Sequence, residues 1–172
     1  IKQLHIVAPP ECYDLDKADF MDEVLLHCGF SISQTDFNYH LPVNEIPFVD
    51  LLHDSEKRRL KKCLEQDFMV VQENLQDYSD VHRLISTCRE RKGFPISMTL
   101  NDFESVIKKF PNRYKVFSVF DKGKRIATAV GVIVNSNILY NFLPADDEAY
   151  SSFSPIVLLN KGIYDYCQQQ NM

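Results

Sequence analysis

Two short clusters of charged residues hold the side chains of this chain that are best suited to chemistry. One cluster is acidic, Asp146-Asp147-Glu148, and its carboxylates could accept a proton from an amine or bind a cationic one. The other is basic, Arg89-x-Arg91-Lys92, and guanidinium groups suit two-pronged contacts with a carboxylate or a phosphate. Each cluster also has a structural interpretation. Acidic loops are usually solvated, and basic residues stabilise the C-terminus of a helix.

A third charged segment is a basic helix. Five of the six residues from 57 to 62 are basic, namely Lys57, Arg58, Arg59, Lys61 and Lys62. Charges of one sign this close together repel, so the segment is either a solvated helix face or a surface for an anion, tRNA included. The whole chain has a net charge of −5 and a pI near 5.5, which excludes a protein whose entire surface binds nucleic acid or anionic membrane.

Other common kinds of site are not indicated by the residues. The five histidines lack the spacing of a zinc motif such as H-E-x-x-H, so we expect no metal. The chain also has no G-x-S-x-G nucleophile motif and no P-loop. Its five cysteines form no C-x-x-C pair, so we expect them to pack as small apolar side chains.

The elements that must position these clusters can be predicted from periodicity and end signals. In the N-terminal part, Leu4 to Val7 is predicted to be a strand, Asp16 to Cys28 a helix ended by Gly29, and Phe30 to Leu41 extended chain that forms a second strand. Pro42 and Pro47 mark a loop before the basic helix, which is predicted over residues 54–64.

In the remaining residues, segments with the apolar spacing of a helix alternate with segments that have the pattern of a strand. Phe68 to Gln72 is predicted to be a strand, Ser79 is predicted to cap one helix, and Thr99 starts a second with a capping box to Asp102. Three extended segments follow, joined by short turns, at residues 114–120, 125–134 and 138–142. Residues 144–150 read as a loop, and Ser154 is predicted to cap a final helix that starts at Pro155. The three extended segments predict an antiparallel meander.

This order of elements resembles the opening of a GNAT acyltransferase domain, and several motifs are similar to the Fem-like branch of that superfamily and to bacterial GNAT-like proteins. The motifs are Ser55-Glu56-Lys57-Arg58-Arg59-Leu60-Lys61-Lys62-Cys63 followed by Phe68-Met69-Val70-Val71, Arg89-x-Arg91-Lys92-Gly93-Phe94-Pro95, Tyr140-Asn141-Phe142-Leu143-Pro144-Ala145, and Ser154-Pro155-x-Val157-Leu158-Leu159-Asn160-Lys161-Gly162-Ile163-Tyr164. The resemblance covers essentially the whole chain.

The resemblance implies an α+β fold with a GNAT-like mixed, mostly antiparallel sheet flanked by helices. Residues 1–66 would form an N-terminal partial GNAT-like half that includes the basic linker helix. Residues 67–172 would form a GNAT-like acyltransferase domain that lacks its C-terminal strands, so we expect the sequence to be a piece of a longer chain.

The resemblance also implies transfer of an acyl or aminoacyl group from a coenzyme A thioester, such as acetyl-CoA, or from aminoacyl-tRNA to an amine. Tyr140 and Asn141 would lie at the reaction cleft, with Tyr140 protonating the leaving group, and the acidic pair Asp146 and Asp147 would serve the amine. Donor binding would fall to a polar and basic set, namely Ser152, Ser154, Lys161, Arg89 and Arg91.

One segment departs from the pattern that the resemblance implies. Ordinary GNAT enzymes hold the pyrophosphate on a glycine-rich loop at the start of a helix, whereas this chain has Tyr150-Ser151-Ser152-Phe153-Ser154-Pro155 there, without glycine. Fem-type relatives also lack that loop. The departure therefore favours either an aminoacyl-tRNA donor or a second interpretation, a binding module that keeps the fold without the reaction. No apolar run is long enough to span a membrane, so we expect a cytoplasmic protein.

Overall fold

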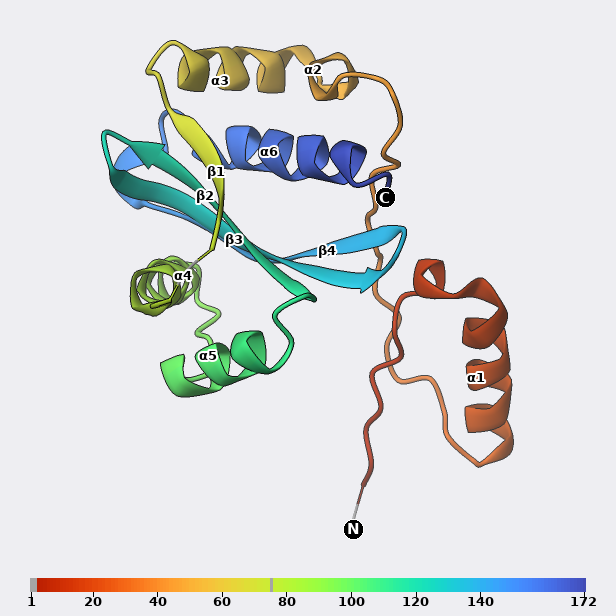
Figure 1. The fold of residues 1–172 in the computed structure, drawn as a ribbon. Helices are drawn as coiled ribbons and strands as arrows, with labels where there is room; N and C mark the ends of the chain where they lie inside the picture. Colours follow the sequence, from red (N-terminus) through yellow and green to blue (C-terminus); the bar gives the residue numbers. More distant parts are fainter. Residues whose placement is uncertain (1–2, 75) are drawn as a thin grey trace. The chain divides into compact units, whose positions relative to one another are not determined.

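The computed structural model describes residues 3–74 and 76–172, and the chain divides into two compact units, Ile1–Pro42 and Val43–Met172. Figure 1 shows the order of their helices and strands. Within the described residues, no helix combines the length and the apolar character needed to cross a membrane.

The first unit is built around one helix. A short 3-10 turn, Glu11–Tyr13, leads into α1, Leu15–His27, as the sequence predicts. The carboxylate of Asp14 caps α1 by accepting from the Lys17 N–H at 3.3 Å. The two predicted strands, at residues 4–7 and 30–41, are wrong for this structure, because residues 3–42 contain no strand. An extended segment forms a strand only when a neighbouring strand accepts its backbone hydrogen bonds.

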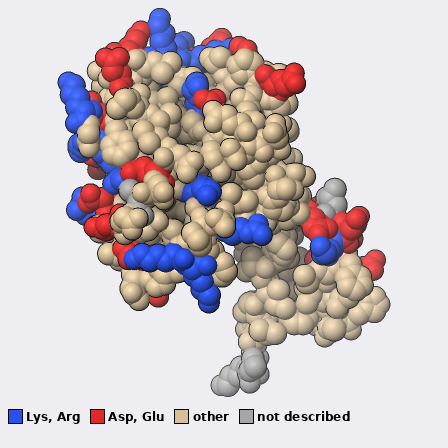
Figure 2. All heavy atoms as spheres, viewed as in Figure 1, with Lys and Arg blue, Asp and Glu red and all other residues tan. Residues whose placement is uncertain are grey.

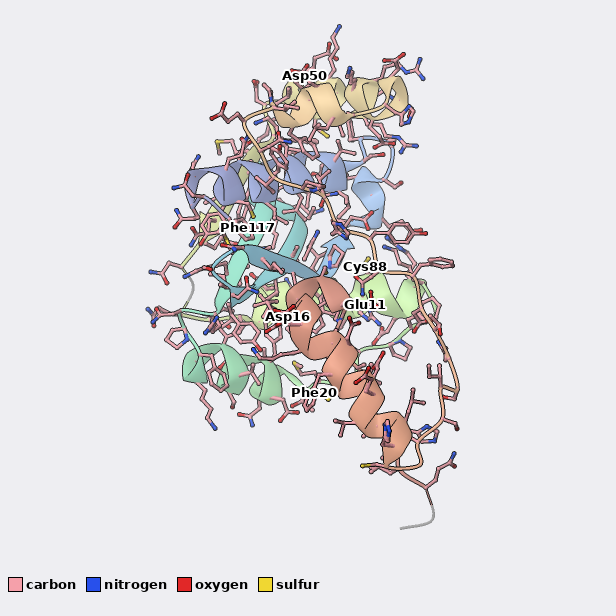
Figure 3. The ribbon with its side chains drawn as sticks, turned by 90° about the vertical axis from the view of Figure 1, so that its right-hand side faces the viewer. Glu11, Asp16, Phe20, Asp50, Cys88 and Phe117 are labelled. Carbon is pink, nitrogen blue, oxygen red and sulfur yellow. The ribbon has the colours of Figure 1, made fainter. Side chains whose placement is uncertain are left out.

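This unit has no buried residue among those whose side chains are described. Large apolar side chains stay in contact with water instead, including Phe20 at 68% exposure on α1 and Phe37 at 91% in the extended segment. Figure 3 shows Asp16 and Phe20 projecting from α1.

The second unit contains a four-stranded antiparallel sheet in the order β1-β2-β3-β4. The strands are β1, Met69–Glu73, β2, Tyr114–Asp121, β3, Lys124–Asn135, and β4, Ile138–Asp146. The last three form the predicted meander. The turn between β2 and β3 places both Lys122 and Gly123 at positive φ, which is the geometry a two-residue hairpin requires.

Helices cover both faces of this sheet (Figure 1). On one face lies α6, Pro155–Gln169, and on the other lie α4, Ser79–Arg91, and α5, Leu100–Lys109. The capping box of α5 forms as predicted between Thr99 and Asp102. Ser79, in contrast, is the first residue of α4 rather than its cap, and its N–H binds the Asp77 carboxylate at 2.8 Å.

Two hydrophobic cores follow from this layering. The core toward α6 includes Phe117 and Leu159, and the core toward α4 and α5 includes Ile85, Phe103 and Val130. Figure 3 shows Phe117 on the sheet below α6. Because both faces are covered, residues 116–119 of β2 are buried without alternation. The α+β class expected from the sequence is confirmed.

A further layer packs on the outer side of α6. It consists of α2, Phe48–Leu51, and the basic helix α3, Asp54–Leu64. Phe48, Leu60 and Cys63 belong to the same core as the α6 residues. The compact unit therefore begins at Val43, whereas the sequence suggested a boundary after residue 66.

Candidate functional site

The most distinctive backbone feature of the second unit is a bulge in β4. Thr128 pairs with Ala145 and Val130 pairs with Phe142, so β4 has one more residue than β3 between these two pairs. The backbone of Leu143 accommodates the extra residue by adopting φ +53, a value that residues other than glycine seldom adopt. Bulges of this kind bend a strand and are frequent next to active sites.

Within this sheet β4 is an edge strand, with β3 on one side and no strand on the other. Every second N–H and C=O of such a strand points away from the sheet and can bind an extended ligand. Pro144, which has no N–H, lies at the bulge, as proline in sheets usually does.

In the sequence, β4 is followed by a 3-10 turn, Glu148–Tyr150, and then by α6. The helix begins at Pro155 as predicted, but Ser154 does not cap it. The Ser154 backbone is left-handed, at φ +56, and its hydroxyl donates to the Ser151 carbonyl at 3.4 Å. The Ser154 side chain therefore accepts from none of the first N–H groups of α6, although the Val157 N–H donates to the Ser154 carbonyl at 3.1 Å. N–H groups that no side chain caps at a helix N-terminus are suited to bind an anion. Ser152, in the turn before them, is exposed.

Asn141 joins β4 to α6. Its side-chain Nδ2 donates to Asn160 Oδ1 at 3.2 Å, while its own Oδ1 is buried and has no hydrogen-bond partner among the described residues. A buried acceptor of this kind is costly unless a ligand or water satisfies it. Asn141 is therefore the predicted site residue with the clearest unfilled bonding capacity.

Tyr140 lies on the opposite face of β4, because side chains alternate along a strand. Its ring contacts the Phe142 ring at 5.7 Å and is 47% exposed. The structure therefore does not bring the predicted pair Tyr140 and Asn141 together on one side of the strand.

The predicted acidic pair lies at the far end of β4, about 20 Å along the strand from Tyr140. Asp146 is 14% exposed and contacts Arg91 at 3.2 Å and Lys92 at 3.6 Å. Asp147 contacts Lys124 at 2.8 Å, and the hydrogen bond from Lys124 holds the pKa of Asp147 below its usual value. A carboxylate with a lowered pKa is a weak base at neutral pH, so Asp147 is better suited to structure than to proton transfer. Asp146 is held in its ion pairs with Arg91 and Lys92, which also gives it a structural role.

The predicted donor-binding residues are dispersed. Arg91 is bound to Asp146 rather than free for a ligand. Arg89 lies on α4 with its Nε buried and without a partner among the described residues. Lys161 lies in the second turn of α6 and pairs with Asp165 at 2.5 Å. These three do not lie at the α6 N-terminus. Of the five predicted donor-binding residues, Ser152 and Ser154 lie there.

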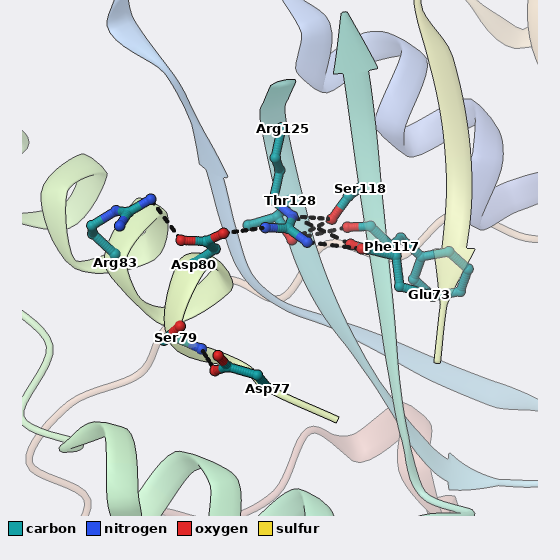
Figure 4. A network of polar contacts seen from close by, with 9 residues as sticks. All are labelled: Glu73, Asp77, Ser79, Asp80, Arg83, Phe117, Ser118, Arg125 and Thr128. Carbon is teal, nitrogen blue, oxygen red and sulfur yellow. Dashed lines mark hydrogen bonds and ion pairs between the residues drawn. The ribbon is translucent and has the colours of Figure 1, made fainter. Parts of the chain in front are cut away.

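A polar network that the sequence reasoning missed lies on the α4 face of the sheet (Figure 4). The Arg125 guanidinium binds both carboxylate oxygens of Glu73, at 2.8 and 3.3 Å, and donates to the Ser118 hydroxyl at 3.1 Å. Ser118 in turn bonds Thr128 at 3.0 Å, and both are fully buried. The sequence did contain one sign of this network, because Ser118 and Thr128 each interrupt an otherwise apolar strand. Nothing local indicated the pairing of Glu73 with Arg125.

The charged side chains of the second unit are otherwise mixed in sign, and Figure 2 shows basic and acidic groups near one another at the left and top of the view, beside a large uncharged area. Among the described residues, no group of three or more His, Cys, Asp or Glu side chains is arranged to hold a metal ion. Compared with known protein families and with curated proteins, the chain matches no family and resembles no curated sequence.

Proposed function

We propose that the second unit transfers an acyl group from a coenzyme A thioester to an amine along the bulged edge of β4. The observation that carries this proposal is a bulged edge strand that leads into a helix whose N-cap residue, Ser154, makes no side-chain cap hydrogen bond. The order of elements, with one strand, two helices, three antiparallel strands and a helix, also supports it because it is the order that the GNAT resemblance implies.

In the proposed reaction, the amine nitrogen attacks the thioester carbonyl carbon. A C–N bond forms, the C–S bond breaks, and coenzyme A leaves as a thiolate that takes up the proton lost by the amine. Outward N–H groups of β4 would bind the carbonyl oxygen as negative charge develops on it. The α6 N-terminus, with Ser152 and Ser154, would bind the phosphates of the donor.

The two faces of β4 suggest separate roles for Tyr140 and Asn141. Asn141 faces α6, so we assign it to positioning the donor. Tyr140 faces the other side, so we assign it to the acceptor side, where its hydroxyl would relay the proton lost by the amine to the leaving thiolate and end the reaction unchanged. Asp146 and Asp147 would support the end of β4 through their ion pairs rather than take part in proton transfer.

Calorimetric titration with acetyl-CoA tests donor binding, and mass spectrometry of an amine panel tests transfer. We expect Asn141→Ala to weaken acetyl-CoA binding and Tyr140→Phe to lower the transfer rate while leaving binding unchanged. Lys109→Gln, on an exposed residue of α5 far along the chain from β4, is the control. Binding without transfer would instead support the alternative, a non-catalytic binding module with this fold.

Aminoacyl-tRNA is the alternative donor. Its phosphates would meet the basic residues of α3, of which Lys57, Arg58 and Lys62 form no ion pair within the described part of the chain. Titration with charged tRNA separates the two donors. Binding that weakens steeply with salt and is lost on replacing these three residues by Ala would favour tRNA over coenzyme A.

A further inference from the structure

An apolar pocket of about 180 Å³ lies between α5 and the sheet of the second unit. We call it the α5 pocket. Its walls come from α5 and from strands β2, β3 and β4, namely Phe103, Val106, Ile107, Tyr114, Val130 and Phe142. Met98, from the loop before α5, also lines it. Apart from the Tyr114 hydroxyl, these side chains contain no oxygen or nitrogen atom, so the pocket offers little to a polar ligand.

The α5 pocket is open to solvent on one side. Met98, Val106 and Phe142 are half-buried, whereas Phe103 and Ile107 are buried behind them. Water finds few hydrogen-bond partners on such walls, so a hydrocarbon group that displaces it gains free energy. The pocket is therefore suited to the apolar part of a ligand.

The volume limits the size of that apolar part. A cavity of about 150 Å³ with aliphatic and aromatic walls holds benzene, a ring of six carbons. The α5 pocket is slightly larger, at about 180 Å³. A hydrocarbon group of about six carbons would therefore fill it, and the end of a longer chain would extend into water.

The α5 pocket lies on the same face of the sheet as Tyr140. Tyr140 and Phe142 are two residues apart on β4, so their side chains point the same way, and Phe142 pairs with Val130 of the pocket wall. The centroids of the Tyr140 and Phe142 rings are 5.7 Å apart. Asn141, which contacts α6, points to the other face. A molecule whose hydrocarbon group fills the pocket can therefore present its polar end to Tyr140 rather than to Asn141.

We propose that the α5 pocket binds the hydrocarbon group of a primary amine, a group of about six carbons. That this amine is the acyl acceptor rests on the proposed function, in which Tyr140 serves the acceptor side. The apolar walls exclude a second charge at the far end of the group, because a buried ammonium would have no partner there. Monoamines are therefore ligands of this pocket, and diamines of the same length are not.

Binding of linear amines from propylamine to decylamine tests the pocket without any acyl donor. Isotope-labelled methyl groups of Met98 and Val130 lie in its walls, and their NMR shifts give a dissociation constant for each amine. Each methylene that enters the pocket should tighten binding about fourfold, until the affinity levels off at about six carbons. 1,6-Diaminohexane should bind at least about tenfold more weakly than hexylamine.

Two variants should move the chain length at which the affinity levels off. Met98→Ala enlarges the pocket, so the levelling point should shift to chains longer by roughly two carbons. Val106→Phe fills part of it, so the affinity should level off at shorter chains. Met69→Ala and Val71→Phe make the same changes at exposed residues of β1, outside the pocket, and should leave the levelling point unchanged. Circular dichroism shows whether each variant folds, and Met98→Ala alone decides the test if Val106→Phe does not.

The outcomes separate this inference from the proposed function. An affinity that does not depend on chain length, or a levelling point that Met98→Ala does not move, overturns the pocket assignment. Mass spectrometry with acetyl-CoA and the same amines then measures transfer. Transfer at one rate for all chain lengths contradicts the pocket and leaves the transferase standing. Binding that depends on chain length, without transfer to any amine, contradicts the transferase and leaves the pocket as a ligand site.

Discussion

At the scale of single residues, Arg125 makes the contacts whose loss should cost most. Its guanidinium is 13% exposed and neutralises Glu73, which is 10% exposed. Replacing Arg125 by Met leaves that carboxylate nearly buried and without a counter-charge, so we expect a loss of about 3 kcal/mol in the free energy of unfolding. Urea denaturation measures this value.

The matched second variant isolates the ion pair. Adding Glu73→Leu to Arg125→Met removes the uncompensated charge, so most of the lost stability should return. If the double variant is less stable than Arg125→Met alone, the carboxylate was not the cause of the loss.

The thiols provide a second prediction at this scale. Cys12 and Cys28 are exposed, whereas Cys63, Cys88 and Cys167 are buried. Burial raises the pKa of the Cys63 thiol to about 11 and raises that of Cys167 as well, so neither is ionised near neutral pH. We expect two thiols to react rapidly with Ellman's reagent in the folded protein and five in denaturant. Rapid reaction of a third thiol in the native state would show that one core is open, the α6 core for Cys63 or Cys167 and the α4 core for Cys88.

At the scale of elements, the contact between α6 and β1 is so close that a glycine is needed in it. A Cβ placed on Gly162 of α6 would overlap Val70 Cγ2 of β1 and lie 3.0 Å from Cγ1. Gly162→Ala should therefore destabilise the protein by about 1 to 2 kcal/mol, although alanine is the better helix former. Thermal unfolding followed by circular dichroism measures the change.

A compensating variant tests the assigned cause. Val70→Ala makes room for the added methyl group, so Gly162→Ala should be tolerated better in that background than in the wild type. Equal losses in both backgrounds would mean that the α6–β1 contact does not explain the need for glycine.

The elements also show which local signals can be trusted. The capping box at Thr99, the Lys122-Gly123 turn and the Ser154-Pro155 start each depend on a few adjacent residues, and each element formed where the sequence predicted it. Strands at residues 4–7 and 30–41 did not form, because a strand depends on a neighbour that local sequence does not specify. The hydroxyl of Ser154 was predicted to cap, but its left-handed backbone directs it elsewhere.

In the candidate site too, features that depend on adjacent residues could be predicted, and features that depend on distant neighbours could not. Tyr140 and Asn141 were predicted on a strand, and they are, but the two-residue period of that strand already implied opposite faces for neighbours. The bulge at Leu143 could not be predicted, since an extra residue is visible only once the register with β3 is known. Arg91 and Asp146 were both singled out, yet their ion pair depends on how α4 packs on β4.

For the whole molecule, the division into two units predicts how stability is distributed. Residues 3–42 bury no described side chain, so removing residues 1–42 should leave the melting temperature of the second unit within a few degrees of the intact chain. Near-ultraviolet circular dichroism and calorimetry on the shortened chain measure this. A large fall in melting temperature would show that the first unit contributes to the core.

The measurement that tests the proposed function most directly is acetyl-CoA binding by the wild type and by Ser152→Glu. Glutamate near the start of α6 is compatible with the helix dipole, so the fold should keep its melting temperature, but its charge would repel the donor phosphates. We predict saturable binding by the wild type, at least about tenfold weaker binding by Ser152→Glu, and unchanged binding by Lys109→Gln. Equal affinity of the wild type and Ser152→Glu for acetyl-CoA, or no binding by the wild type, would contradict a donor site at β4 and α6.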